Sequence, residues 1–276
     1  MSLPLSLIII VASTALAVTA MLVARHFAPE GSRFTDSDRA AGVFGVIGTA
    51  FAILLGFVVL LAFDSYSHAK TTAATEATAV ADSFQTASLF PAAERDDLEG
   101  ALICYARAVI HQGWPAMRDA QPSSGVEVWT YRLERVADAL HLQGTKQDDA
   151  FSALLANRDT REEARRERVG AAGHTVPTIM WVLLVLACVA PLLFLLCFAD
   201  PGEPAAVQGL LMGAVAALIA AAILAVLVLD SPFSGKDGSI EPKAMQYTLR
   251  VMEHDRTIAR GSPSAPCDAN GRPLRA

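Results

Sequence analysis

The sequence predicts an all-α membrane protein with four spanning helices and a helical domain inserted between the second and third spans. Four segments carry no charged residue: 3–24, 40–63, 175–199 and 204–229. Each reaches the roughly 20 residues that a helix needs to cross a hydrocarbon core about 30 Å thick. Lipid offers no partner for exposed backbone N–H and C=O groups, so such segments span as helices. The composition agrees, with 53% apolar and 18% charged residues.

The first span is expected to be retained in the membrane. It begins Met-Ser-Leu-Pro, without Lys or Arg. Its apolar run is longer than the about 7–15 residues that are usual in a secretory signal peptide. The alternative of a cleaved signal stays open, because the stretch 17–20 (Ala-Val-Thr-Ala) loosely resembles a cleavage site.

The basic residues near the membrane ends predict the orientation of the spans. In the loop 25–39, Arg25, Arg33 and Arg39 are offset by Glu30, Asp36 and Asp38, and the loop 199–206 has no Lys or Arg. The side of the membrane that carries the inserted domain and the tail holds more basic residues: Lys70, Arg158, Arg161, Arg165, Arg166, Arg168, Lys236 and Lys243. Both termini and the inserted domain are therefore expected in the cytoplasm.

The inserted domain is expected to consist of helices, because it shows no alternation of apolar and polar residues. The second span continues without Gly or Pro until Pro91, which predicts one long helix. Further helices are expected at 92–112, 126–142 and 147–169. The boundaries follow as 1–64 for spans one and two, 65–174 for the cytoplasmic domain, 175–230 for spans three and four, and 231–276 for a cytoplasmic tail. A tail helix is expected at 243–258, followed by disorder from about residue 261.

Small residues recur at intervals of four in two of the spans, and this pattern predicts close helix packing, because it lets backbones approach in lipid. The fourth span carries Gly209, Gly213, Ala217 and Ala221, and the second carries Gly48, Ala52 and Gly56. Packing within the chain and packing between subunits both fit the pattern.

Several function classes are excluded by what the sequence lacks. No ionisable residue lies inside a span, which argues against a proton-driven transporter or an intramembrane hydrolase. No catalytic or nucleotide-binding motif occurs, so we expect neither an enzyme nor a cofactor. The net charge of −6 gives no footprint for nucleic acid. The four cysteines are scattered and have no CxxC spacing, so neither a metal site nor a disulfide framework is expected.

The exits of the second and fourth spans resemble the Bestrophin-like domain family of bacterial membrane proteins, often treated as a domain of unknown function. Residues 56–66 read Gly-Phe-Val-Val-Leu-Leu-Ala-Phe-Asp-Ser-Tyr, and Arg165, Arg166 and Pro177 precede or open the third span. The most specific motif comprises Asp230, Pro232, Phe233, Ser234 and Gly235. The resemblance implies a relation to bestrophins, which are pentameric anion channels with four spans per subunit. It also implies the inner membrane of a bacterium, with the lipid bilayer, copies of the same chain and small anions as partners.

In bestrophins a hydrophobic neck on the second span lines the pore and ends in a Gly-Phe pair, which Gly56 and Phe57 resemble. The resemblance therefore implies that Thr49, Ile53 and Phe57 line a pore. Another apolar stripe, which comprises Phe44, Phe51 and Leu55, could line it instead, and contact with lipid or with other helices is a third alternative.

No Ca²⁺ clasp is expected after the fourth span. Calcium-gated bestrophins have a run of acidic residues there, whereas this chain has only Asp230, Asp237 and Glu241, with Lys236 among them. Ca²⁺ prefers six or more oxygen ligands. The residues Pro232 to Gly235 are expected to stop the helix and turn the tail back onto the cytoplasmic domain.

Two functions therefore remain in competition. The first is an oligomeric channel, for anions by resemblance, with a hydrophobic constriction on the second span, because a hydrophobic gate needs only apolar side chains. The second is a non-conducting structural or sensory membrane protein whose cytoplasmic helices bind a partner.

Overall fold

The computed structural model describes residues 3–28, 37–142, 144–174, 176–260 and 265–274. The predicted contributions of Glu30, Arg33 and Asp36 to the orientation lie outside these residues. The chain forms two compact units. Unit 1 comprises Met1–Tyr66, His174–Asp230 and Lys236–Gly238, and unit 2 comprises Ser67–Gly173, Ser231–Gly235 and Ser239–Ala276. Helices account for nearly all regular structure in the described residues, as predicted.

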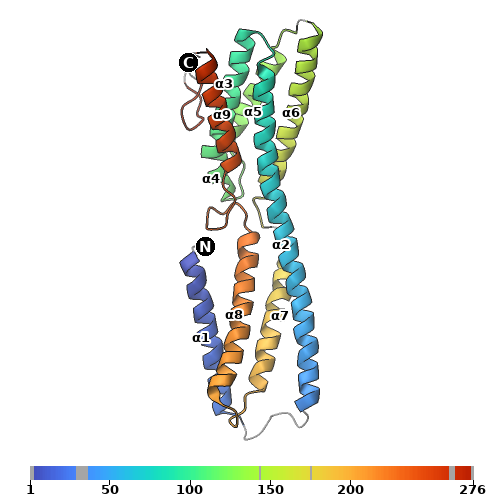
Figure 1. The fold of residues 1–276 in the computed structure, drawn as a ribbon, viewed down its shortest axis with the longest axis vertical. Coiled ribbons are helices and arrows are strands. Elements are labelled where there is room, and N and C mark those ends of the chain that lie inside the picture. The colour runs from blue at the N-terminus through green and yellow to red at the C-terminus, as the bar shows by residue number, and fades with distance from the viewer. Residues whose placement is uncertain (1–2, 29–36, 143, 175, 261–264, 275–276) are drawn as a thin grey trace. The chain divides into compact units, whose positions relative to one another are not determined.

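Among the described residues, four helices are long and apolar enough to cross a membrane, which confirms the predicted spans. They are α1 (Leu3–His26), α2 (Ser37–Ala87), α7 (Thr178–Cys197) and α8 (Ala205–Leu229). Helix α2 has 51 residues and would be about 76 Å long at 1.5 Å per residue. It ends just before Pro91, so the single long helix that the sequence predicted is observed (Figure 1).

The core of unit 1 lies where α2, α7 and α8 meet. Val58 and Ala62 of α2 are buried against Leu184 of α7 and Val226 of α8. Helix α1 packs beside α8, where Met21 and Met212 are buried together (Figure 1). Apolar contacts between helices therefore hold the four spans of one chain together.

Unit 2 contains the remaining helices and the C-terminal part of α2. They are α3 (Ala92–Ala108), η1 (Val109–Gly113), α4 (Trp114–Met117), α5 (Ser124–Asp138), α6 (Thr145–Gly170) and α9 (Lys243–Arg260). The helix expected at 92–112 is thus divided, because η1 is a π-helical turn that adds a residue to the helical ladder. The buried side chains of Tyr105 and Trp129 lie at the centre of this unit.

The C-terminal segment, which we define as residues 265–274, differs from the predicted disorder. A disulfide joins its Cys267 to Cys104 of α3, against the expectation of no disulfide. Trp129 Nε1 donates a hydrogen bond to Gly271 O at 2.6 Å. Residue 271 must be glycine, because φ is +75° and a Cβ would lie 2.4 Å from Ala108 N. Composition alone gave no sign of these contacts, which are made with residues far away in the sequence.

Candidate functional site

The structure places Thr49, Ile53 and Phe57 on a face of α2 that is exposed in the single chain. The exposed fractions of Ile53 and Phe57 are 69% and 53%. Thr49 Oγ1 donates to Gly45 O at 2.8 Å, so this hydroxyl is satisfied within the helix. The face therefore presents apolar groups and one internally bonded hydroxyl.

The stripe that could have lined a pore instead is used for packing within the chain. Phe51 and Leu55 pack against the buried cluster formed by α2, α7 and α8. Phe44 stacks on Phe194 of α7, with ring centroids 5.6 Å apart. Because these side chains hold unit 1 together, the face with Ile53 and Phe57 is the better candidate for a pore lining.

The small residues of the second span have no close neighbour across from them. A Cβ added at Gly48 or at Gly56 would meet no atom within 4 Å, and Ala52 is exposed. Within the described residues, the stripe Gly48, Ala52 and Gly56 thus packs against nothing in its own chain. Packing between subunits and contact with lipid are both compatible with this open surface.

The small residues of the fourth span behave differently. A Cβ at Gly213 would lie 3.3 Å from Val18 Cγ2 and 3.4 Å from Thr14 Cγ2 of α1. Gly209 faces the same Val18 side chain at 3.5 Å. Farther along α8, Ala217 is half-buried and Ala221 is exposed. Gly209 and Gly213 therefore pack against α1, whereas Ala217 and Ala221 are more exposed.

Beyond the span, the exposed face of α2 continues with one carboxylate and two hydroxyl side chains. Asp64, Thr71 and Thr78 lie within about 20° of Ile53 on an ideal helix with 3.6 residues per turn. All three are exposed. The hydroxyls of Thr71 and Thr78 donate to carbonyls four residues earlier, at 3.0 and 3.1 Å. Along this line of the α2 surface, the apolar side chain of Ile53 is followed by the polar side chains of Asp64, Thr71 and Thr78.

The motif after the fourth span divides its contacts between two elements. In unit 1, Asp230 is buried and accepts a hydrogen bond from Val176 N at 2.7 Å, and His174 Nδ1 lies 3.1 Å from its other oxygen. In unit 2, Phe233 is buried edge-on against Trp114, with centroids 5.7 Å apart.

A turn completes the motif. Gly235 has φ +71°, Pro232 O accepts from Ile240 N at 2.7 Å, and Ser234 N donates to Ser231 O at 3.2 Å. Trp114 Nε1 donates to Ile240 O at 3.0 Å. These contacts place Phe233 and Ile240 against Trp114 within unit 2.

The carboxylates near this turn are engaged separately. Asp237 accepts from Leu3 N at 2.8 Å, and Glu241 pairs with Lys243 at 3.0 Å. Among the described residues, no three His, Cys, Asp or Glu side chains gather as metal ligands would. These positions therefore give no indication of a cation site.

Unit 2 holds a buried ionic cluster that the sequence did not reveal as a unit. The side chains of Glu76 and Arg168 are 0% and 1% exposed, and they form a bidentate ion pair. Tyr105 donates its hydroxyl to Glu76 Oε1 at 2.6 Å. The Arg168 guanidinium lies over the Trp114 ring, 4.8 Å from its centroid.

Electrostatics favour the protonated forms of Tyr105 and Arg168. Burial raises the pKa of Tyr105 far above its ordinary value, and Glu76 raises it further. Burial lowers the pKa of Arg168, but Glu76 outweighs this and the net direction is upward. Residues 92 positions apart make this pair, so no local signal could have found it.

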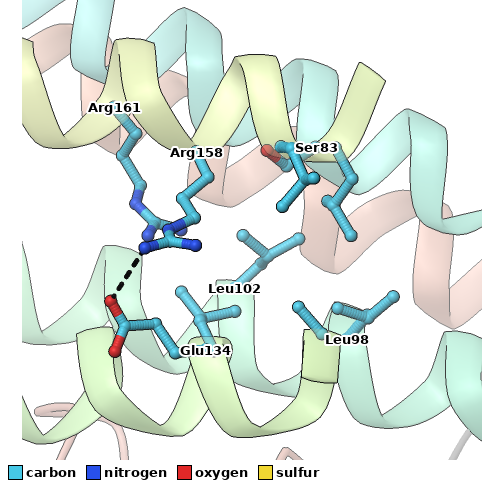
Figure 2. Close-up of a pocket in the computed structure, with 10 residues that line it drawn as sticks. Ser83, Leu98, Leu102, Glu134, Arg158 and Arg161 are labelled. Carbon is cyan, nitrogen blue, oxygen red and sulfur yellow. Dashed lines mark hydrogen bonds and ion pairs between the residues drawn. The ribbon is translucent and has the colours of Figure 1, made fainter. Parts of the chain in front are cut away.

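A narrow pocket between α3, α5 and α6 is lined by leucines at one end and by arginines at the other. Figure 2 shows the ends of Arg158 and Arg161 side by side, with Leu98 at the far side of the pocket and Leu102 between them. Arg158 pairs with Glu134 at 3.4 Å and with Glu162 at 3.2 Å, and its hydrogen bond to Glu162 raises its pKa. Arg161 pairs with Glu162 at 3.4 Å, and the Ser83 hydroxyl donates to Ala79 O at 2.8 Å. Because these polar groups already have partners, this pocket offers helix packing rather than chemistry.

Comparison with known proteins gives a consistent result. A family model described as Bestrophin-like domain matches residues 11–265. A crystal structure of a bacterial bestrophin homolog from Klebsiella pneumoniae is similar at 14% identity and a TM-score of 0.67, covering 89% of this chain and 96% of that one. Another structure of a Klebsiella pneumoniae homolog has 15% identity and a TM-score of 0.66, covering 89% and 97%. A structure described as a membrane protein has 14% identity and a TM-score of 0.69, covering 92% and 99%. No curated protein matches.

Proposed function

The chain belongs to the Bestrophin-like domain family, and from that premise we propose that it assembles as a homo-oligomer around a central pore and acts as a membrane channel for small ions. By analogy with bestrophins the assembly is a pentamer. The observation that carries the proposal is the contrast between two faces of α2. Ile53 and Phe57 are exposed, whereas Val58 and Ala62 are buried within the chain.

The unpacked glycines support an arrangement with other copies beside α2. Gly48 and Gly56 belong to a stripe on a different face of α2 from Ile53 and Phe57. Both glycines have open space where a Cβ would be. Small residues in lipid let helices approach closely, so this surface suits a neighbouring copy. Around a symmetry axis, Ile53 and Phe57 then form stacked apolar rings, which resist wetting and hold a pore closed without a charged gate.

The conducted ion could be an anion or a cation, and a different observation favours each. The relation to bestrophins favours small anions. A specific observation favours cations instead: Asp64 is exposed and lies on the same line of α2 as Ile53, and rings of carboxylates select cations. Replacing Asp64 with Asn decides between them, because only a cation pathway loses selectivity in this variant.

Flux through liposomes that contain the purified protein tests the proposal. The double variant Ile53→Ala with Phe57→Ala should raise ion flux several-fold, because smaller rings wet more easily. The matched control removes similar apolar volume from exposed positions elsewhere in unit 1, with Ile8→Ala and Leu210→Ala, and should leave flux unchanged. Ile53→Lys should bias the pathway toward anions. A monomeric protein, or no flux in both wild type and the double alanine variant, would rule out the channel in favour of the structural or sensory role.

We propose the orientation that the basic residues predict, with both termini and residues 65–174 on the cytoplasmic side of the bacterial inner membrane. A cysteine introduced as Gly202→Cys should react with a membrane-impermeant maleimide from outside. A cysteine introduced as Ser123→Cys should react only after the membrane is opened. Labelling of Ser123→Cys in intact cells would reverse the orientation.

A further inference from the structure

A single covalent bond ties the end of the chain to the core of unit 2. The disulfide between Cys104 and Cys267 links α3 to the C-terminal segment across 163 residues of sequence. Cys104 is fully buried, and Cys267 is 5% exposed. The other two cysteines, Cys188 and Cys197, are free thiols in α7.

Apart from this bond, a few side-chain donors hold the C-terminal segment. Gln112 Nε2 donates to Asn270 O at 2.8 Å, and Trp129 Nε1 donates to Gly271 O at 2.6 Å. Arg107 reaches Asp268 O at 3.3 Å. The segment is also structured internally, since Asp268 Oδ1 accepts from two of its backbone amides at 2.9 and 2.8 Å. It can therefore lift off as one small piece when these contacts break.

The segment lies where α3 becomes the π-helical turn η1. Gly271 packs directly on the backbone of Arg107 and Ala108, at the last residues before η1 begins. Trp129, fully buried, packs in the same cluster as Ala108 and Val109. Opening the segment exposes this Trp129 ring and uncovers the turn.

We propose that Cys104 and Cys267 form a redox-controlled latch, which holds the C-terminal segment on α3 and η1 when oxidised and releases it when reduced. The proposal rests on the cytoplasmic orientation proposed above, because disulfides in that compartment are usually transient and redox-sensing.

The reductant is a low-molecular-weight thiol. Its thiolate attacks one sulfur of the bond, which forms a mixed disulfide and frees the other cysteine. A second thiol then attacks the mixed disulfide, so that two small thiols become one small disulfide and the protein gains two electrons and two protons as two cysteine thiols.

Burial of both sulfurs makes local opening the step that admits the reductant. Lifting the C-terminal segment breaks only its own contacts with the rest of unit 2, so it requires less free energy than unfolding the whole unit. Once the bond is cut, no covalent tether returns the segment to α3. Reduction therefore shifts the segment from bound to open, and reoxidation by an added thiol oxidant restores it.

The test counts thiols in the full-length protein carrying Cys188→Ala and Cys197→Ala, so that only the latch can react. Cells are quenched with acid, and free thiols are labelled with a polyethylene glycol maleimide that shifts mobility on a gel. The latch predicts two adducts in untreated cells, none after a thiol oxidant, and two again after dithiothreitol.

Release is then measured on the purified protein in detergent. Reduction should shift tryptophan emission to longer wavelength and speed proteolysis of the C-terminal segment, and the emission change should vanish in Trp129→Phe. The double variant Cys104→Ser with Cys267→Ser should resemble the reduced protein in tryptophan emission and in proteolysis. Dithiothreitol should change neither readout in this variant.

Three results would overturn the latch. If the bond is present in untreated cells while Ser123→Cys stays protected from outside label, the disulfide is a permanent cross-link in a correctly oriented protein. If the bond is permanent and Ser123→Cys is labelled from outside, the proposed orientation fails as well. If the bond is reduced reversibly but emission and proteolysis do not change, the segment stays bound and no latch operates.

Discussion

Replacing Glu76 with Ala should destabilise unit 2 more than any surface substitution. Both oxygens of Glu76 are used, by Arg168 Nε and Nη2 and by the Tyr105 hydroxyl. Without the carboxylate, the Arg168 guanidinium, 1% exposed, keeps only Met117 Sδ at 2.9 Å and the Trp114 face. Breaking a buried ion pair by removing one partner costs about 3–5 kcal/mol.

This cost translates into a measurable change in thermal stability. For a domain of about 150 residues, 1 kcal/mol lowers Tm by roughly 3 °C, so we expect a drop of about 10 °C. Thermal unfolding of the detergent-solubilised protein, followed by circular dichroism, measures it. The matched control is Asp82→Ala, which removes an exposed carboxylate from the same helix and should change stability by less than about 0.5 kcal/mol.

A second variant keeps the reasoning falsifiable. Glu76→Leu combined with Arg168→Met removes both charges and retains apolar volume, so it should recover most of the lost stability. A loss below about 1 kcal/mol for Glu76→Ala would show that the pair contributes little to stability. A double variant no more stable than the single one would show that the lost packing and the unpaired Tyr105 hydroxyl, and not the unpaired charge, cause the effect.

Two further predictions concern packing and pH. Gly213→Leu should lower the free energy of unfolding in detergent by about 1–3 kcal/mol, because the new side chain meets Val18 and Thr14. The control Ala214→Leu, at the neighbouring exposed position, should leave it unchanged. If Gly213→Leu is as stable as wild type, α1 can move aside. Burial, and after it the charge of Glu76, raises the pKa of Tyr105 above its ordinary value of 10.0. Above that pH the unfolded chain loses a proton that the folded chain keeps. The free energy of unfolding should therefore fall as pH rises. Thermal unfolding across this range should show a steeper decline for wild type than for Tyr105→Phe, and parallel curves would contradict the assignment.

Local features of the sequence were sufficient to predict the class of the fold. The absence of charge over four long segments specified the spans, because the bilayer accepts only helices that satisfy their own backbone. The 51-residue helix α2 followed from an alanine-rich stretch without Gly or Pro before Pro91. The proposed pore-lining residues came from resemblance, and the structure adds that Ile53 and Phe57 are exposed.

Tertiary structure alone decided which faces of these helices are used. Inside the span α2 is apolar all round, so its pattern could not say that Phe51 and Leu55 pack inward and Ile53 faces outward. The same small-residue spacing packs tightly at Gly213 and stands open at Gly56, because only Gly213 has a neighbouring helix in its own chain.

Pairs of residues that are far apart in the sequence could not be predicted from the sequence either. Glu76 finds Arg168 92 residues away, and Cys104 finds Cys267 163 residues away. Neither pair leaves a periodic or local trace, since each depends on where separate helices come to lie. The sequence by itself determined which segments become helices and which of them enter the membrane. Packing determined which side chains are buried together, because burial and pairing are properties of the assembled chain.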